Sequence, residues 1–316
     1  MRKTLAVLIT YFNEKELLTE CLKSLLSQPE GPDEILVYDD ASQSPASRYI
    51  PEEWPVKVIR GEVNGGAGRA RNVLLEQSEN DYIHFHDADD LFHPDWCKRI
   101  RNVIDVDEPD IVITEVSAFK NGKLICKEAL GLKQILVTKD LVRFALSGII
   151  LTPSITVKRN IALKTGGFRS REVIEYSEDF DFNVRLAATG ATYNAIFEPL
   201  VIQNVRPKSL SYEPGKACWV DMVKSIGMLS SELPSQYKND LAETAARCGH
   251  TLFNINARKE AKEAFRLAKR LGVPEYRYQR PPLRILAKIL NPEAAEHIGV
   301  VYRYMIPERL RKFLVK

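Results

Sequence analysis

Short apolar runs of strand length alternate with helical segments in the N-terminal part of the chain. The four runs lie at residues 5–9, 35–38, 56–59 and 82–86. Residues 67–77 predict a helix after a glycine turn, and Asn13 with Glu16 predicts a capping box at the start of an earlier helix. Continuous apolar strands separated by helices are typical of a parallel sheet that is buried on both faces. The pattern therefore predicts an α/β fold with helices on both faces of the sheet.

After residue 110 the alternation becomes less regular. Residues 111–119 are strand-like and precede a hairpin turn signal at Asn121-Gly122. Further strand patterns lie near 155–157 and 192–197. We therefore expect a mixed, mostly parallel sheet.

Length and composition give the expected organisation. A chain of 316 residues is too long for one small core. We expect one domain over residues 1–215 and a helical C-terminal region over 216–316 that is basic and amphipathic towards its end. The net charge of +3 gives no dominant attraction to nucleic acid. Five scattered cysteines predict reduced thiols in the cytoplasm, and the chain lacks an apolar run long enough to span a membrane.

Polar clusters follow the predicted strands. They lie at residues 11–14, 39–42, 64–68 and 87–90. Ligands bind beyond the carboxyl ends of parallel strands, so the clusters predict one shared site. Asp87 and Asp89 offer oxygen ligands that suit Mg²⁺ or Mn²⁺, although Asp is also common in turns for its own local hydrogen bonds.

Two further motifs are ambiguous when taken alone. The glycine turn at 64–68 opens a helix with Arg69 and Arg71, and it either binds an anion or only caps the helix. Glu178 and Asp179 begin a helix predicted at 178–188. These acidic residues either stabilise the helix N-terminus by interacting with the helix dipole, or one of them supplies a general base.

The ordered motifs resemble the inverting family-2 glycosyltransferases of GT-A fold, over about residues 4–212. The resemblance rests on Tyr11-Phe12-Asn13-Glu14, Asp39-Asp40-Ala41-Ser42, Asn64-Gly65 to Arg71-Asn72, Asp87-Ala88-Asp89-Asp90, Gly166-Gly167-Phe168, Glu178-Asp179 and Arg185-Leu186. It implies a Rossmann-like GT-A domain that transfers a sugar from a nucleotide-sugar, with a UDP-sugar favoured, to a glycan or lipid-linked acceptor. It also implies a divalent cation, Mn²⁺ or Mg²⁺.

The resemblance also implies residue roles. Asp179 is the expected catalytic base with Glu178 beside it, and Asp89 is the expected metal ligand, with Asp87 near the metal or the ribose. Asp40 is expected to accept from the base N–H while Asp39 supports the turn. The full donor-binding set is Thr10, Tyr11, Phe12, Glu14, Asp39, Asp40, Asn64, Gly65, Arg71, Asp87, Ala88 and Arg206. The ring of either Phe12 or Tyr11 is expected against the nucleobase.

One position departs from the family pattern. Many relatives carry a histidine that can complete the metal site, in a segment matched here by residues 204–211. Arg206 occupies its place. A guanidinium has no lone pair for a metal, but it can hold a diphosphate directly.

Several alternatives remain open at this stage. His84 and His86 share a strand face, but packing is favoured over a zinc site because the ligand set is incomplete. The basic, apolar segment 276–316 either lies on an anionic membrane, as a peripheral protein would, or packs with a solvated basic face. Two other functions compete with that of a glycosyltransferase, namely a nucleotidyltransferase and a non-catalytic binding module.

Overall fold

The computed structural model describes residues 2–148, 150–206, 215–272, 274–279 and 281–305, without the side chains of 302–305. The chain forms two compact units, Met1–Pro214 and Gly215–Lys316. Across this described part, no helix combines the length and apolar character that crossing a membrane requires.

The first unit is built on one mixed sheet. Its strands are β1 (Leu5–Tyr11), β2 (Glu34–Asp39), β3 (Lys57–Arg60), β4 (Tyr82–Asp87), β5 (Leu91–Phe92), β6 (Ile111–Lys120), β7 (Lys123–Cys126), β8 (Ile155–Lys158) and β9 (Tyr193–Asn204). Within the described residues they form nine strands in the order β3-β2-β1-β4-β8-β6-β9-β5, with β7 paired to β6. The first four strands in that order are parallel to one another. Strand β8 pairs antiparallel with both β4 and β6, and so connects the parallel part to the remaining strands. The predicted mixed α/β sheet is confirmed.

Strand register brings the predicted site residues together. Thr10 lies opposite Asp87 on β4, and Tyr11 lies opposite Asp39 on β2. Parallel strands end at the same edge of a sheet, so three of the four polar clusters begin at neighbouring positions.

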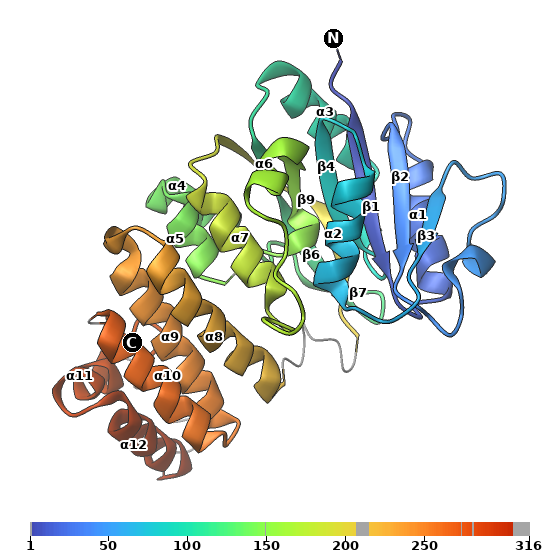
Figure 1. Ribbon diagram of the computed structural model, residues 1–316. Helices are drawn as coiled ribbons and strands as arrows, with labels where there is room; N and C mark the ends of the chain where they lie inside the picture. The colour runs from blue at the N-terminus through green and yellow to red at the C-terminus, as the bar shows by residue number, and fades with distance from the viewer. Residues whose placement is uncertain (1, 149, 207–214, 273, 280, 306–316) are drawn as a thin grey trace. The chain divides into compact units, whose positions relative to one another are not determined.

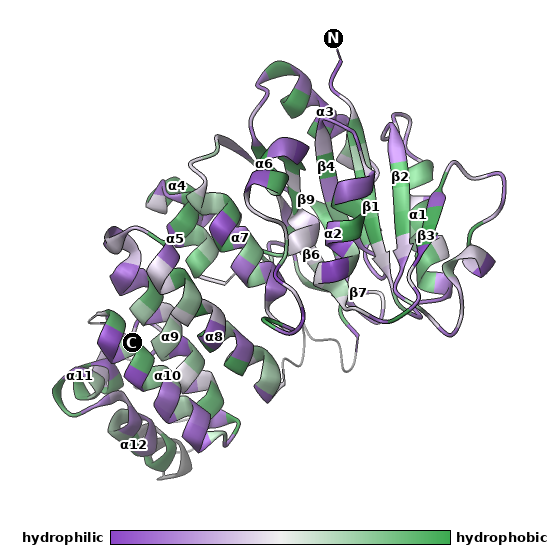
Figure 2. Ribbon diagram, in the orientation of Figure 1, coloured by the Kyte–Doolittle hydropathy of each residue, from purple (hydrophilic) through white to green (hydrophobic). Residues whose placement is uncertain are grey.

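Helices cover both faces of this sheet. They are α1 (Glu16–Leu26), α2 (Ala67–Gln77), α3 (Trp96–Val106), α4 (Ile135–Thr138), α5 (Leu141–Leu146), α6 (Arg159–Lys164) and α7 (Glu178–Ala188), with short 3₁₀ helices at Ala46–Tyr49, Leu132–Gln134 and Thr152–Ser154. Figure 1 shows α2 in front of β1 and β4, with α1 and α3 behind the sheet. Figure 2 shows β1 hydrophobic over most of its length, as expected for a strand buried on both faces.

Successive side chains of β4 point to opposite faces of the sheet and so contact the helices on both sides. His84 and His86 point to the α3 face, where the His84 ring lies 4.5 Å from Trp96 and the His86 ring stacks on Phe92 at 3.8 Å. Burial lowers the pKa of both histidines, so they are neutral packing residues. Phe85 points the other way, with its ring 5.9 Å from Phe182 of α7. This contact fixes the start of α7 above the end of β4.

The predicted capping box at α1 is wrong. The helix begins at Glu16 after Lys15, which makes no side-chain cap. Asn13 adopts a φ of 65°, and its side-chain oxygen accepts from the Ser44 N–H at 3.2 Å. The asparagine therefore closes the loop after β1 onto the loop after β2, an alternative use of its amide.

The second unit is helical. Its helices are α8 (Lys216–Glu232), α9 (Lys238–Asn254), α10 (Arg258–Leu271), α11 (Pro281–Ile289) and α12 (Pro292–Met305), with a 3₁₀ helix at Ser235–Tyr237. Leu252 and Phe253 of α9 pack against Ala261, Ala264 and Phe265 of α10. The small residues of α10 let the two helices approach closely.

Candidate active site

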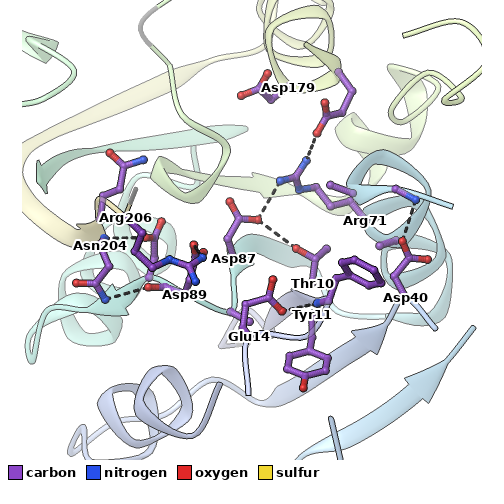
Figure 3. Close-up of a pocket in the computed structure, with 18 of the residues that line it drawn as sticks. Thr10, Tyr11, Glu14, Asp40, Arg71, Asp87, Asp89, Asp179, Asn204 and Arg206 are labelled. Carbon is purple, nitrogen blue, oxygen red and sulfur yellow. Dashed lines mark hydrogen bonds and ion pairs between the residues drawn. The ribbon is translucent and has the colours of Figure 1, made fainter. Parts of the chain in front are cut away.

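A pocket opens at the carboxyl ends of β1 and β4. It has a volume of about 410 Å³, and residues at the start of α2, the start of α7 and the end of β9 also line it. Figure 3 shows the side chains that line it. The predicted residues that line it are Thr10, Tyr11, Phe12, Glu14, Asp40, Asn64, Arg71, Asp87, Ala88, Asp89, Glu178, Asp179 and Arg206.

Arg71 links the two sides of this pocket. The residue is only 5% exposed, and its guanidinium donates to Asp87 Oδ1 at 2.9 Å and to Glu178 Oε1 at 2.8 Å. Asp87 Oδ1 also accepts from the Thr10 hydroxyl at 3.1 Å. Figure 3 shows the resulting chain from α7 through α2 to β4 and β1. Burial raises the pKa of Asp87, but Arg71 overcomes that effect and lowers it overall, so Asp87 is ionised.

Asp179 stands beside this chain and forms no ion pair within the described residues, although the Arg71 charge acts to lower its pKa. Glu178 takes the Arg71 ion pair, while Asp179 accepts only the Phe180 N–H, at 2.7 Å. Burial, together with the neighbouring Glu178 carboxylate, raises the pKa of Asp179 to about 7. A carboxylate with a pKa near neutrality has the basicity that proton transfer at physiological pH requires.

The opposite side of the pocket is rich in carboxylates. Asp89 forms an ion pair with Arg206, and the Asn204 side-chain amide donates to the Asp89 carbonyl at 2.9 Å. Burial and the Asp87 charge raise the pKa of Asp89 even though Arg206 opposes them. Burial, with Asp89, also raises the pKa of Glu14 to about 7. Arg206 is 43% exposed at its side chain, so the pair reaches solvent.

Asp40 lies under the glycine turn. Its two carboxylate oxygens accept from Gly65 N–H at 2.9 Å and from Gly66 N–H at 2.8 Å. Asp40 lines the pocket, whereas Gly65 and Asp39 do not. Asp39 is buried, and it accepts from the Ser42 N–H at 2.8 Å and from Arg60. Asp39 therefore holds the turn after β2.

Tyr11 and Phe12 face different environments. The Tyr11 side chain is buried, and its hydroxyl donates to the Ser44 carbonyl at 2.7 Å. Phe12 is 46% exposed at the pocket. Of these two rings, Phe12 is the one that a planar ligand can reach.

The start of α2 is locked to the segment before α7. The Asn72 side chain accepts from the Phe168 N–H and donates to the Phe168 carbonyl, each at 2.8 Å. The Phe168 ring lies 4.1 Å from Phe182. This clamp brings the glycine turn and the Glu178-Asp179 pair to one pocket, although they are about a hundred residues apart in the chain.

The statistical model of the family described as Glycosyl transferase family 2 matches residues 6–163, half of the chain. The chain belongs to this family. The match covers β1 to α6 and therefore includes the glycine turn and the Asp87 to Asp90 cluster.

Similar proteins include glycosyltransferases from bacteria. An uncharacterized glycosyltransferase of Haemophilus influenzae is 29% identical over 189 residues, which cover 58% of this chain and 61% of the relative. Poly(ribitol-phosphate) beta-N-acetylglucosaminyltransferase TarS of Staphylococcus aureus is 28% identical over 189 residues, which cover 57% of this chain and 32% of TarS. The chain thus matches less than two thirds of the length of either relative.

Solved structures show the GT-A fold of this family-2 chain. TarS residues 1–349 in complex with UDP-GlcNAc superpose with a TM-score of 0.69 at 18% identity, covering 93% of this chain and 90% of the other. The mannosyltransferase PcManGT of Pyrobaculum calidifontis, in complex with GDP-Man and Mn²⁺, has a TM-score of 0.57 at 18% identity, covering 96% and 88%.

The carboxylates suit a divalent cation only in part. Oxygen donors are the ligands that Mg²⁺ and Mn²⁺ prefer. Burial, and to a lesser extent a neighbouring carboxylate, raises the pKa of both Glu14 and Asp89. Across the described residues, however, no three metal-binding side chains converge. Asp89 could offer a cation one carboxylate, which pairs with Arg206 here, so further ligands would have to come from outside this set of side chains.

Sequence reasoning did not assign several pocket residues. Tyr176 and Gln203 line the pocket from segments without a local motif, and Asn204 lines it from the first position of the segment 204–211. Asp90, the third acid of its cluster, is buried, and it accepts from the Asn204 N–H at 3.0 Å. The sequence marked Asp90 through its place beside Asp89 and Asn204 through its place near Arg206. Residues 207–211 of the segment after β9 lie outside the described part of the chain.

Proposed function

We propose that this chain is an inverting glycosyltransferase that moves a sugar from a nucleoside diphosphate sugar to an acceptor hydroxyl. One observation carries the proposal. The carboxylate of Asp179, which forms no ion pair within the described residues, shares a pocket with the Asp89–Arg206 pair. A base on one side and cationic groups on the other are what a single displacement needs.

The base in this proposal is Asp179. As the acceptor oxygen bonds to the anomeric carbon, its proton passes to an Asp179 oxygen, and the bond from that carbon to the diphosphate oxygen breaks. The pKa of about 7 leaves a substantial fraction of Asp179 ionised at neutral pH. Glu178 is the less suitable base because Arg71 holds its carboxylate at 2.8 Å. No covalent nucleophile takes part in this scheme.

The donor occupies the other side of the pocket. The exposed Phe12 ring suits stacking on the nucleobase, and Asp40 lies at the same end. We favour a UDP-sugar because TarS, which shares the fold, is solved with UDP-GlcNAc. A divalent cation at Asp89 would neutralise charge on the leaving diphosphate. Arg206 is placed to contribute positive charge to the same group.

The acceptor is proposed to be a cell-surface glycan or a lipid-linked glycan. The name of TarS, a poly(ribitol-phosphate) beta-N-acetylglucosaminyltransferase, supports a polymeric acceptor of this kind. A cytoplasmic protein that meets such acceptors benefits from peripheral attachment to the membrane. The basic C-terminal region is the proposed means of attachment, although Arg309, Arg311, Lys312 and Lys316 lie outside the described residues.

Binding of a panel of nucleotide-sugars, measured by calorimetry with and without Mn²⁺, tests the donor assignment. We expect UDP-sugars to bind most tightly and slow donor hydrolysis to accompany binding. Binding without any turnover by the wild-type protein would favour the non-catalytic module instead. The absence of binding by every nucleotide-sugar would refute the proposed function.

A further inference from the structure

The helical second unit contains a pocket of its own. It has a volume of about 400 Å³ and lies among α10, the residues Gly272, Pro274 and Tyr276, α11 and the start of α12. Phe265, Tyr276 and Ala287 are buried there, and Leu290 lines it while remaining 56% exposed. Its size falls in the range of small-molecule sites.

Cations surround this apolar floor. Lys262, Arg266, Lys269 and Lys288 line the pocket, against a single carboxylate from Glu293. None of these four cations forms an ion pair or hydrogen bond with another residue of the described chain. Lys216 and Arg277, in contrast, pair with Glu260 and Glu275. The pocket therefore holds positive charge that the protein does not compensate.

Exposed apolar side chains are also found on α11 outside the pocket. Ile285 and Ile289 stand one helical turn apart and are 58% and 71% exposed. Exposed apolar side chains on a basic helical unit are typical of surfaces that bind lipid. Residues 215–316 carry 19 Lys and Arg against 10 Asp and Glu, whereas residues 1–214 carry 26 against 32. Positive charge is thus concentrated in the unit that has this pocket.

We propose that this pocket binds an anionic phospholipid at the surface of a bilayer. The four cations hold the phosphate of the headgroup, and the floor at Phe265 and Leu290 takes the first part of an acyl chain. This inference deepens the membrane attachment proposed above and rests on it, because it names the site and the class of lipid. It does not depend on catalysis.

Flotation of the full chain with vesicles, at physiological ionic strength, tests this site. Wild-type protein is expected to bind vesicles of phosphatidylcholine mixed with phosphatidylglycerol, and not vesicles of phosphatidylcholine alone. The double variant Lys262→Glu/Lys269→Glu should lower the partition coefficient at least about 30-fold. The matched control Lys238→Glu/Lys259→Glu reverses two exposed lysines of the same unit outside the pocket, and it should change binding less than about threefold because salt screens distant charges.

An apolar pair of variants separates a lipid site from simple charge attraction. Leu290→Ser should weaken vesicle binding about tenfold through lost apolar burial. Ile255→Ser, at a similarly exposed isoleucine after α9 and outside the pocket, should not. Equal losses in the pocket variants and their controls would show diffuse attraction and overturn the proposal. Failure of the wild-type protein to bind anionic vesicles would overturn it as well.

Two further measurements assign any failure to its cause. One possible result is that inorganic phosphate binds the wild-type protein but not the Lys262→Glu/Lys269→Glu variant, while neither of these two proteins binds vesicles. The site would then serve a free phosphate compound, and the lipid assignment would be wrong. All variants should keep the nucleotide-sugar affinity of the wild-type protein. A wild-type protein that binds anionic vesicles but no nucleotide-sugar would refute the proposed function and leave the lipid site standing.

Discussion

At the residue scale, Asp179 determines the expected pH dependence. A general base works only when it is ionised, and burial with Glu178 raises its pKa to about 7. We expect kcat/KM to rise with pH up to about 7 and to level off above it, with a roughly tenfold loss per pH unit below. Glu14 shares a pKa of about 7, so Glu14→Gln is the control. The control variant should show the same fall in kcat/KM below about pH 7. A pH profile of the wild-type enzyme that stays flat down to about pH 5 would contradict the assignment of Asp179 as the base.

Arg206 gives a second prediction at this scale. Its guanidinium pairs with Asp89 at the pocket. If it supports the departing diphosphate, Arg206→Ala should slow transfer about 10- to 100-fold, the usual effect of one charge-assisted hydrogen bond. Acceptor binding should change less. Arg206→Lys keeps the charge and should retain more activity, while Arg206→His should be more dependent on Mn²⁺. Unchanged rates and metal dependence across a Mn²⁺ titration would leave Arg206 without this role.

Individual residues show what the sequence could and could not predict. The motifs identified most of the side chains that line the pocket, because strand ends meet at one edge. The Arg71 bridge from Asp87 to Glu178 was not predictable, since Arg71 and Glu178 are 107 positions apart and meet only through the packing of α2 and α7. Tyr176 and Gln203 have no local pattern that marks them.

At the element scale, the junction between α2 and α7 gives the next prediction. Gly167 has a φ of +66°, and a Cβ there would lie 2.4 Å from Asn72 Oδ1, the atom that accepts from Phe168. Gly167→Ala should lower the unfolding free energy by about 2–4 kcal/mol, through backbone strain and the clash. Gly166→Ala is the control: its φ is +83° with no atom near the new Cβ, so about 1–2 kcal/mol is expected. Equal losses of Tm in both variants would show that the Asn72 clamp contributes little.

The same elements show where pattern reasoning is strong. The segment 67–77 and the segment 178–188 were predicted as helices with the bounds that α2 and α7 have. The start of α1 was predicted wrongly, because Asn13 uses its amide in a contact with the next loop. Helical periodicity depends on neighbours along the chain, whereas this cap depends on Ser44, which only the fold brings near.

At the scale of the whole molecule, the donor pocket belongs to the first of two compact units. A ligand that binds only the folded state stabilises that state, by about 2.7 kcal/mol at a hundredfold excess over its Kd. UDP should therefore raise the calorimetric Tm of the first unit and leave the transition of the helical unit unchanged. Uridine, which lacks the diphosphate, is the control and should shift it less. A shift confined to the helical unit would place the nucleotide site elsewhere.

Single-turnover transfer by Asp179→Asn, measured with a saturating UDP-sugar, shows whether Asp179 is the base. The substitution keeps the size of the side chain and removes its basicity. We expect a rate at least about 100-fold below wild type, with donor affinity unchanged because Asp179 lies on the acceptor side. A variant that loses donor binding but keeps substantial turnover would instead make Asp179 a structural residue.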